Sequence, residues 1–159
     1  MIAVIAVLAG AGIALLAGGH AEAAAEEAAR HLAADLAYAQ ADALAKGSAR
    51  SVVFEVDAER YEIQATDNGA ILTHPVSKRP FEVDLAGLFP GISLDLVSAD
   101  FSGATTLTFA PNGTPQAGGT VTVGAARHRF RVSVADGTGR VEIEALAAAG
   151  SDPEDPVAD

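Results

Sequence analysis

The sequence predicts an α+β protein in which one long N-terminal helix packs on an antiparallel β-sheet head. The first 46 residues contain no proline and are rich in Ala and Leu, which are strong helix formers. After Gly47 the chain changes to short alternating runs separated by turn residues, the pattern of antiparallel strands. With 159 residues the chain is long enough to bury a substantial core.

Charge and cysteine content exclude several classes of function. Ten Lys and Arg residues stand against 21 Asp and Glu residues, which leaves a formal net charge of −11. Such a charge repels a phosphate backbone and disfavours nucleic acid as the main partner. The chain has no cysteine, which excludes a disulfide framework, a thiol nucleophile and Cys-ligated zinc.

The chain opens with an apolar segment, MIAVIAVLAGAGIALLAGGH, in which residues 2–17 form an uninterrupted apolar run. These sixteen residues are slightly fewer than the ~20 that span a hydrocarbon layer of ~30 Å. Small residues recur at every fourth position, either by chance in an Ala- and Gly-rich segment or to let a second helix approach closely. They are Ala6, Gly10, Ala14 and Gly18. We predict that residues 1–19 form a membrane anchor and a helix-packing segment.

A cleaved secretory signal is the alternative for this segment. A site of the small-x-small type is present at Ala21-Glu22-Ala23. However, no Lys or Arg precedes Arg30, whereas a secretory signal carries positive charge ahead of its apolar run. In this alternative the mature protein is a soluble secreted β domain.

Residues 20–47 are predicted to form the amphipathic half of the same helix. Apolar residues recur at steps of three and four, and most charged residues lie off that line. The apolar stripe consists of Ala25, Ala28, Leu32, Leu36, Ala39 and Ala43. Lys46 followed by Gly47 is typical of a helix end. The pair Gly18-Gly19 is where we expect the helix to loosen.

Residues 48–149 are predicted to form the antiparallel β head. Turn residues such as Asp67-Asn68-Gly69 and Pro111-Asn112-Gly113 separate the strands. The stretch HPVSKRPF contains two prolines and is expected to be a loop. Residues 150–159 are acidic and contain proline, and we expect them to be disordered. The expected strands are Ser51–Val56, Tyr61–Ala65, Phe81–Asp84, Ile92–Val97, Thr105–Ala110, Thr120–Val123, His128–Val134 and Arg140–Ala145.

The sequence contains no pattern that indicates catalysis or metal binding. The four histidines lack an HExxH motif or another paired spacing, and we interpret them as solvated or incidental. They are His20, His31, His74 and His128. Gly10-Ala11-Gly12 lies within the apolar segment and not at a strand-to-helix turn, so it does not indicate a dinucleotide site. We predict a non-enzymatic protein with no catalytic residues, cofactor or metal.

One basic cluster surrounds Phe130. In a strand its three arginines, Arg127, Arg129 and Arg131, share one face. Such a face fits nucleic acid or an acidic partner. Because the net charge is −11, we interpret it as a solvated sheet face or a protein-contact surface.

Several stretches together resemble the minor pseudopilin H family, also called GspH/FimT-like, whose members are type IV pilin-like. The later part of a pilin-type transmembrane segment is similar to VIAVLAGAGIALL, and the helix end and first hairpin are similar to LAADLAYAQADALAKGSARSVVFEVDAERYEI. The closing strands resemble LTFAPNGTPQAGGTVTV and FRVSVADGTGRVEI, with an Asn-Gly turn, a Gly-Gly pair before a strand and a final Thr-Gly-Arg-Val. The resemblance covers residues 4–143.

The resemblance implies a pilin-like fold and a structural role in a type II secretion filament, which helps folded proteins cross the outer membrane. It also implies a single-pass protein of the bacterial inner membrane, with its head in the periplasm. The implied partners are other pseudopilins or pilins, contacted through the N-terminal helix. The alternative within this resemblance is a minor pilin of a type IV pilus, concerned with DNA uptake.

The sequence departs from the family at its start. Members begin with a short basic leader that ends in Gly and is followed by Phe-Thr-Leu-x-Glu, where the prepilin peptidase cuts. That cleavage motif is absent, and the aligned position of its Glu falls at or just before Met1. We expect either a start codon upstream of the Met1 codon or a subunit that has lost processing. The proline near the middle of the family's helix is also lacking.

Overall fold

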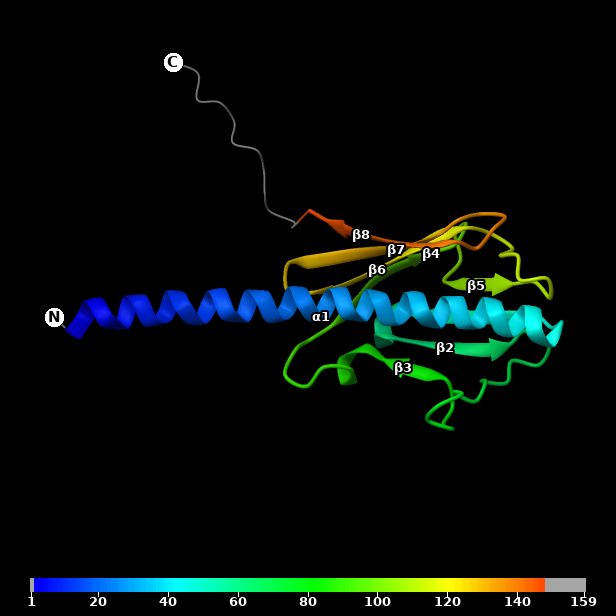
Figure 1. Cartoon of the computed structure of the whole chain (residues 1–159), viewed down its shortest axis with the longest axis horizontal. Coiled ribbons are helices and arrows are strands. Elements are labelled where there is room, and N and C mark those ends of the chain that lie inside the picture. The colour runs from blue at the N-terminus through cyan, green and yellow to red at the C-terminus, as the bar shows by residue number, and fades with distance from the viewer. Residues whose placement is uncertain (1, 148–159) are drawn as a thin grey trace, which may run out of the picture.

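A single long helix, α1 (Ile2–Lys46), extends from a β head in the computed structural model of the chain (Figure 1). The structure describes residues 2–147, with side chains from Gly19 onward, so the predicted disordered segment 150–159 lies outside the described residues. At ~1.5 Å per residue, the 45 residues of α1 make a helix roughly 68 Å long. The helix is continuous through Gly18-Gly19, so the expected loosening does not occur.

The structure confirms the predicted antiparallel β head, whose eight strands in the described residues form two four-stranded sheets. The strand order is β3-β2-β1-β5 in the first sheet and β4-β6-β7-β8 in the second, and all paired strands are antiparallel. Two short 3₁₀ turns, Val56–Ala58 and Leu85–Gly87, follow β1 and β3. The strands are β1 (Arg50–Glu55), β2 (Arg60–Ala65), β3 (Glu82–Asp84), β4 (Asp95–Asp100), β5 (Thr106–Phe109), β6 (Gly119–Ala125), β7 (His128–Val134) and β8 (Val141–Leu146).

The fourth strand begins three residues later than predicted. The sequence predicted a strand over Ile92–Val97, but β4 begins at Asp95. Leu94 is fully buried and Ile92 packs against the core, so their apolar character reflects burial and not strand pairing. A register shift against β6 between Leu96 and Ser98 marks a further irregularity in this strand.

The attached half of α1 lies along both sheets. It contacts β1 and β5 of the first sheet and β6, β7 and β8 of the second. In Figure 1, β2 and β3 lie on one side of the helix, and β7 and β8 lie on the other. The helix and both sheets share one hydrophobic core. The predicted apolar stripe is fully buried in this core: Ala25, Ala28, Leu32, Leu36, Ala39 and Ala43.

Within the described part of the chain, no helix is both long and apolar enough to cross a membrane. The side chains of residues 1–18 lie outside that part, and they include nearly all of the predicted anchor. The predicted packing residues Ala6, Gly10, Ala14 and Gly18 fall in the same region.

Candidate subunit interface

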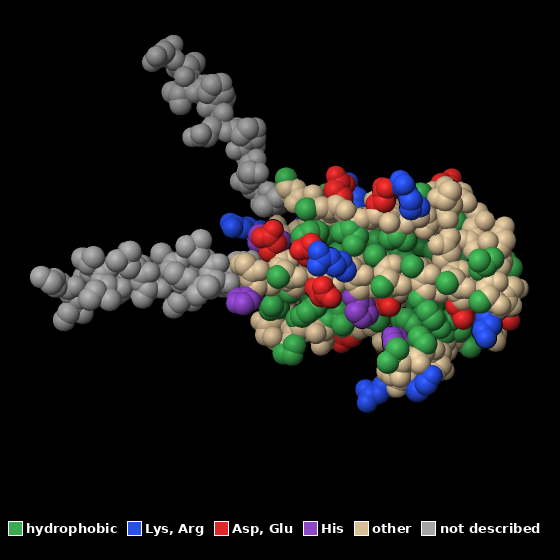
Figure 2. Space-filling model, in the orientation of Figure 1, with side chains coloured by type: hydrophobic (Ala, Val, Ile, Leu, Met, Phe, Trp, Pro, Cys, Tyr) green, Lys and Arg blue, Asp and Glu red, His purple; other side chains and the backbone are tan. Residues whose placement is uncertain are grey.

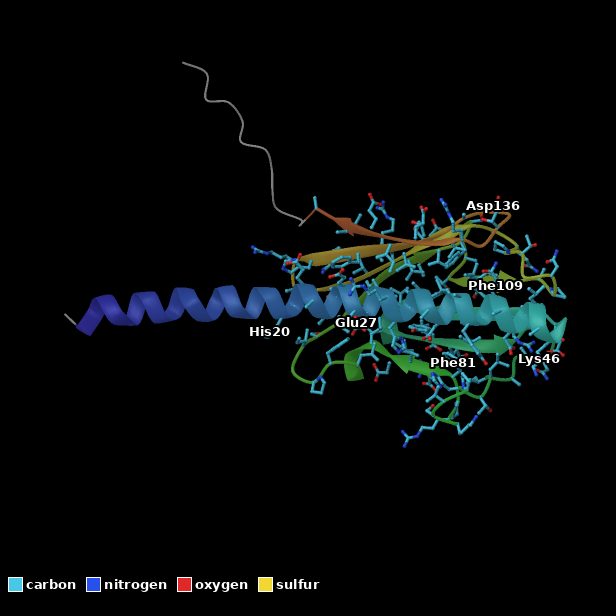
Figure 3. All side chains as sticks on the ribbon, viewed as in Figure 1. His20, Glu27, Lys46, Phe81, Phe109 and Asp136 are labelled. Atoms are coloured by element: carbon cyan, nitrogen blue, oxygen red, sulfur yellow. The ribbon has the colours of Figure 1, made fainter. Side chains whose placement is uncertain are left out.

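The helix α1 projects from the head at one end and is attached to it at the other. Because both parts belong to one continuous helix, the contacts with the head determine the direction of the projecting part. Figure 3 shows the attached part between Phe109 on one side and Phe81 on the other. In addition to the buried stripe, polar residues of the helix contact the head, among them Asp35, Gln40 and Asp42.

Asp35 is a buried carboxylate that joins α1 to β2. Tyr61 of β2 is fully buried and donates its hydroxyl hydrogen to Oδ2 of Asp35 over 2.7 Å. His31, one helical turn before Asp35, places Nδ1 at 3.2 Å from the same oxygen and at 3.3 Å from the Tyr61 hydroxyl. The three side chains therefore form one hydrogen-bonded group between the helix and the first sheet.

The surroundings of this group change two pKa values. Burial, reinforced by the negative charge of Asp35, raises the pKa of Tyr61 well above its ordinary value, so the phenol stays protonated and donates its hydrogen bond. The hydrogen bond to Asp35 raises the pKa of His31, although partial burial of the ring acts in the opposite direction. The charged form of His31 therefore strengthens the link.

Asp42 joins the end of α1 to the start of β1. The Nε atom of Arg50 donates a hydrogen bond to Oδ2 of Asp42 over 2.6 Å. Both side chains are largely buried, with 10% of Arg50 and 15% of Asp42 exposed. Removing one partner of a buried ion pair costs about 3–5 kcal/mol, because the other charge is left without compensation. This pair is therefore the attachment with the greatest expected effect on stability.

Gln40 joins the helix to two loops at the far end of the head. Its Nε2 donates to the carbonyl oxygen of Gly113, between β5 and β6, over 2.8 Å, and to that of Thr138, between β7 and β8, over 2.9 Å. Gly139 has a φ of +71°, and a Cβ at this position would lie 2.5 Å from Gln40 Nε2. Glycine thus permits both the left-handed backbone and the close approach of Gln40.

The face of α1 that points away from the head carries exposed small side chains. Ala34, Ala37 and Ala41 follow one another at steps of three and four, and they are exposed. Leu44, one step further, is 62% exposed. Because the side chains of Ala34, Ala37 and Ala41 are small, a second helix can approach this face of α1 closely.

A shallow groove of about 410 Å³ lies near the point where α1 leaves the head. Figure 3 labels His20 and Glu27 in this region, and Figure 2 shows acidic and basic side chains mixed around it. Apolar side chains of the segment before β4 form its other wall. The lining residues are His20, Ala23, Ala24, Glu26, Glu27, Arg30, Phe89 and Ile92.

The three arginines of the predicted partner surface are placed differently from one another. Arg129 and Arg131 lie in β7, where they alternate with the buried Phe130 and Val132, whereas Arg127 is exposed in the turn before the strand. Arg129 lies 3.9 Å from Asp95, and Arg131 lies 3.5 Å from Glu144. Two of the three positive charges thus have a carboxylate nearby, which reduces their attraction for an outside partner.

The four histidines lie in different surroundings and do not form a common site. His31 belongs to the Asp35 group, His74 accepts backbone hydrogen bonds in the loop before β3, and His128 lies 3.9 Å from Glu22. His20 lines the groove. Among the described residues, no group of three or more His, Cys, Asp or Glu residues could hold a metal ion.

The profile of one protein family matches the part of the chain that forms this attachment. The family is described as Type II transport protein GspH, and its profile matches residues 28–139, which is more than half of the chain. The chain belongs to the GspH family. The GspH match includes Asp35, Gln40 and Asp42 together with their partners on the head.

Two solved structures extend the comparison of this GspH family chain to the fold. The minor pseudopilin EpsH from the type 2 secretion system of Vibrio cholerae has a TM-score of 0.53 and 17% identity, over 79% of this chain and 98% of EpsH. The type IV minor pilin FimU of Pseudomonas aeruginosa has a TM-score of 0.55 and 23% identity, over 78% of this chain and 93% of FimU. No curated protein sequence matches significantly. The chain is a structural subunit of the pseudopilin and pilin type.

Close backbone contacts explain why glycine occupies both positions of the pair Gly118-Gly119, one of the features shared with the GspH family. A Cβ on Gly119 would lie 2.2 Å from the carbonyl oxygen of Asp100, and one on Gly118 would lie 2.7 Å from the amide nitrogen of Asp136. Neither backbone atom can move away as a flexible side chain could. Glycine at both positions therefore allows the start of β6 to pass between neighbouring segments.

Sequence patterns alone do not identify Asp35, Gln40 or Asp42 as attachment residues. A signal was present, because Asp35 and Asp42 are seven residues apart and lie on one face of a helix, beside the apolar stripe. The partners Tyr61 and Arg50 lie in strands, and nothing in the local sequence connects them with the helix.

Proposed function

We propose that this chain is a minor pseudopilin-like, non-enzymatic subunit of a type II secretion filament, which helps export folded proteins across the outer membrane. The observation that carries the proposal is the helix α1, of which one half is attached to the head while the other half projects. A projecting helix can pack among the helices of other subunits while the heads remain on the outside. Membership of the GspH family supports this role.

In this proposal the segments of the chain have separate tasks. Residues 1–19 anchor the subunit in the inner membrane before assembly and pack among other pseudopilin helices afterwards, with Ala6, Gly10, Ala14 and Gly18 on the packing face. Lipid and neighbouring helices are both apolar surroundings, so one apolar surface serves both states. Residues 20–47 attach the helix to the head, residues 48–149 form the periplasmic head, and residues 150–159 form an acidic tail.

A minor pilin of a type IV pilus is the second candidate. The likeness to the minor pilin FimU favours it, since that fold comparison gives a TM-score similar to the one for EpsH. The two candidates share the helix and the head and differ in the filament that they join. Nucleic acid is not the expected partner of either, because the chain has a net charge of −11.

The test is to delete the gene in its host and to measure secretion and piliation separately. We expect loss of a secreted folded protein from the medium, with pili unchanged, and restoration by the full chain. A chain in which residues 2–17 are replaced by an unrelated apolar helix of equal length separates anchoring from packing, and we expect it to enter the membrane without restoring secretion. Loss of pili with normal secretion would favour the second candidate, and no loss of either would contradict the proposal.

A further inference from the structure

The loop between β2 and β3 forms a small projecting hairpin, which we call the basic hairpin (residues 71–81). Its two arms pair through an isolated bridge between Thr73 and Pro80, and a second bridge joins Ile71 to Gln64 of β2. The amide of His74 donates to the carbonyl of Arg79 over 2.8 Å. Figure 1 shows the hairpin beneath β3, at the edge of the head. Its backbone is thus fixed by its own hydrogen bonds.

The basic hairpin is also connected rigidly to the core. The His74 ring lies 4.6 Å from the ring of the buried Phe81, which in turn stacks on Tyr38 of α1 at 5.3 Å. Nδ1 of His74 accepts hydrogen bonds from the amides of Val76 and Ser77 over 3.1 and 3.2 Å. The tip therefore presents a defined surface, which reduces the entropy lost when a partner binds.

The tip of the basic hairpin carries two positive charges, Lys78 and Arg79, that form no ion pair in the described part of the chain. Six of the ten Lys and Arg residues form ion pairs within the described part of the chain. Lys78 and Arg79 are adjacent, exposed and not among the paired residues there. Figure 2 shows basic side chains on the lobe at the lower edge of the head. An acidic partner can therefore approach this tip without displacing an existing ion pair.

Exposed apolar side chains stand beside these charges. Val76 is 82% exposed, the highest value among the large apolar side chains that are exposed in the described residues. Ile71, at the base of the same hairpin, is 39% exposed. The surface fits a partner segment that alternates carboxylates with small apolar residues, because each kind of side chain then meets its complement.

The chain itself contains such a segment. Residues 151–159, SDPEDPVAD, contain four carboxylate side chains, two prolines, a valine and no Lys or Arg. This segment follows β8 of the second sheet, whereas the basic hairpin belongs to the first sheet, on the other side of α1 (Figure 1). Within one copy, the acidic segment would have to pass around α1 to reach the hairpin. A contact with the hairpin of a second copy does not require this.

We propose that the basic hairpin of one subunit binds the acidic segment 151–159 of a neighbouring copy. This inference rests on the proposed function, since it supplies a contact between heads of adjacent subunits. The hairpin and the acidic segment are different surfaces, so the contact between two copies is heterologous. A few exposed charges bind weakly, and the high local concentration in an assembly compensates for this weakness.

The experiment uses the full chain in detergent and intermolecular paramagnetic broadening. Because the chain has no cysteine, Val157→Cys carries a single spin label. The labelled chain is mixed with ¹⁵N-labelled chain, and the amides of the second protein are observed. We expect loss of peak intensity at the amides of residues 74 and 76–79, and recovery of that intensity at high salt or with the double variant Lys78→Glu/Arg79→Glu.

The matched control is the double variant Lys46→Glu/Arg127→Glu. It makes the same change of charge at two other basic residues. Like Lys78 and Arg79, Lys46 and Arg127 form no ion pair in the described part of the chain. We expect it to keep the broadening at the hairpin. Absence of broadening at the amides of residues 74 and 76–79, or equal recovery with both double variants, would overturn the proposal. As a further comparison, a DNA duplex is added to the ¹⁵N-labelled chain. If the duplex shifts the hairpin amide signals and the spin-labelled chain does not broaden them, the hairpin binds nucleic acid instead.

The same measurements separate this inference from the proposed function. If the wild-type chain restores secretion but gives no broadening at the hairpin, only the hairpin contact is contradicted. Failure of the full chain to support secretion, with the broadening present, removes the proposed function and leaves the contact between copies.

Discussion

The first sheet and the far loops hold the helix α1 in different ways. Toward the first sheet, the carboxylates of Asp35 and Asp42 meet Tyr61 and Arg50, so the attachment depends on charge and burial. Toward the loops, the neutral side chain of Gln40 meets two backbone carbonyls, and glycine provides the space. The direction of the projecting helix is therefore set by two physically independent attachments, which different substitutions can break separately.

The largest effect is expected at the ion pair of the first sheet. Arg50→Met keeps most of the side-chain volume but leaves Asp42 without its partner in a largely buried position. We expect the free energy of unfolding to fall by about 3 kcal/mol, measured by urea denaturation of the full chain in detergent. The control is Arg140→Met, whose exposed pair with Glu142 contributes within about 0.5 kcal/mol. Equal losses in the two variants would contradict the role of burial.

An intermediate effect is expected at the loop attachment. Gly139→Ala places a Cβ in a left-handed conformation and against Gln40. The left-handed conformation alone costs about 1–2 kcal/mol for a residue with a Cβ, and we expect a loss of this size. Gly19→Ala is the matched control, because it lies in the helix with no atom within 4 Å of the added Cβ, and helix propensity stabilises it by up to ~1 kcal/mol. Similar losses at both sites would show that the backbone at Gly139 imposes no special requirement.

The smallest effect is a pH dependence of stability that comes from His31. Because folding raises the pKa of His31, its contribution to stability is fully present below the unfolded value of about 6.5 and is lost as pH rises through the folded pKa. The groups that face His31 are Asp35, Glu27 and Tyr61. We expect the difference in unfolding free energy between the wild-type chain and His31→Gln to be larger at pH 5.5 than at pH 8.5. A difference independent of pH would contradict the link between His31 and Asp35.

The sequence predicted the elements of the fold that depend on local patterns. The absence of proline up to Lys46 and the stripe around Leu32 and Leu36 predict α1, and the structure confirms it. Alternation and turn residues predicted all eight strands, and only β4 is displaced, because Leu94 is buried outside the strand. These elements were accessible because their determinants lie within a few residues of one another.

The division into two sheets and the attachment residues were not predicted. Strand β5 returns to β1 across about fifty residues of chain, so its partner is set by packing and not by its own sequence. The same holds for Tyr61, which lies 26 residues from Asp35, and for the carbonyl of Thr138, which lies 98 residues from Gln40. In the described part of the chain, the polar residues that join helix and head were recognised only when their partners were placed.

The most direct test of the account is photo-crosslinking from the projecting half of α1 in secreting cells. A photoreactive amino acid replaces Gly10, on the predicted packing face, or Gly12, which lies two positions further and on the nearly opposite face of the helix. If the subunit enters a filament through its helix, Gly10 gives adducts with another pseudopilin in higher yield than Gly12. Equal yields at the two positions, or adducts with lipid alone at both, would contradict the account.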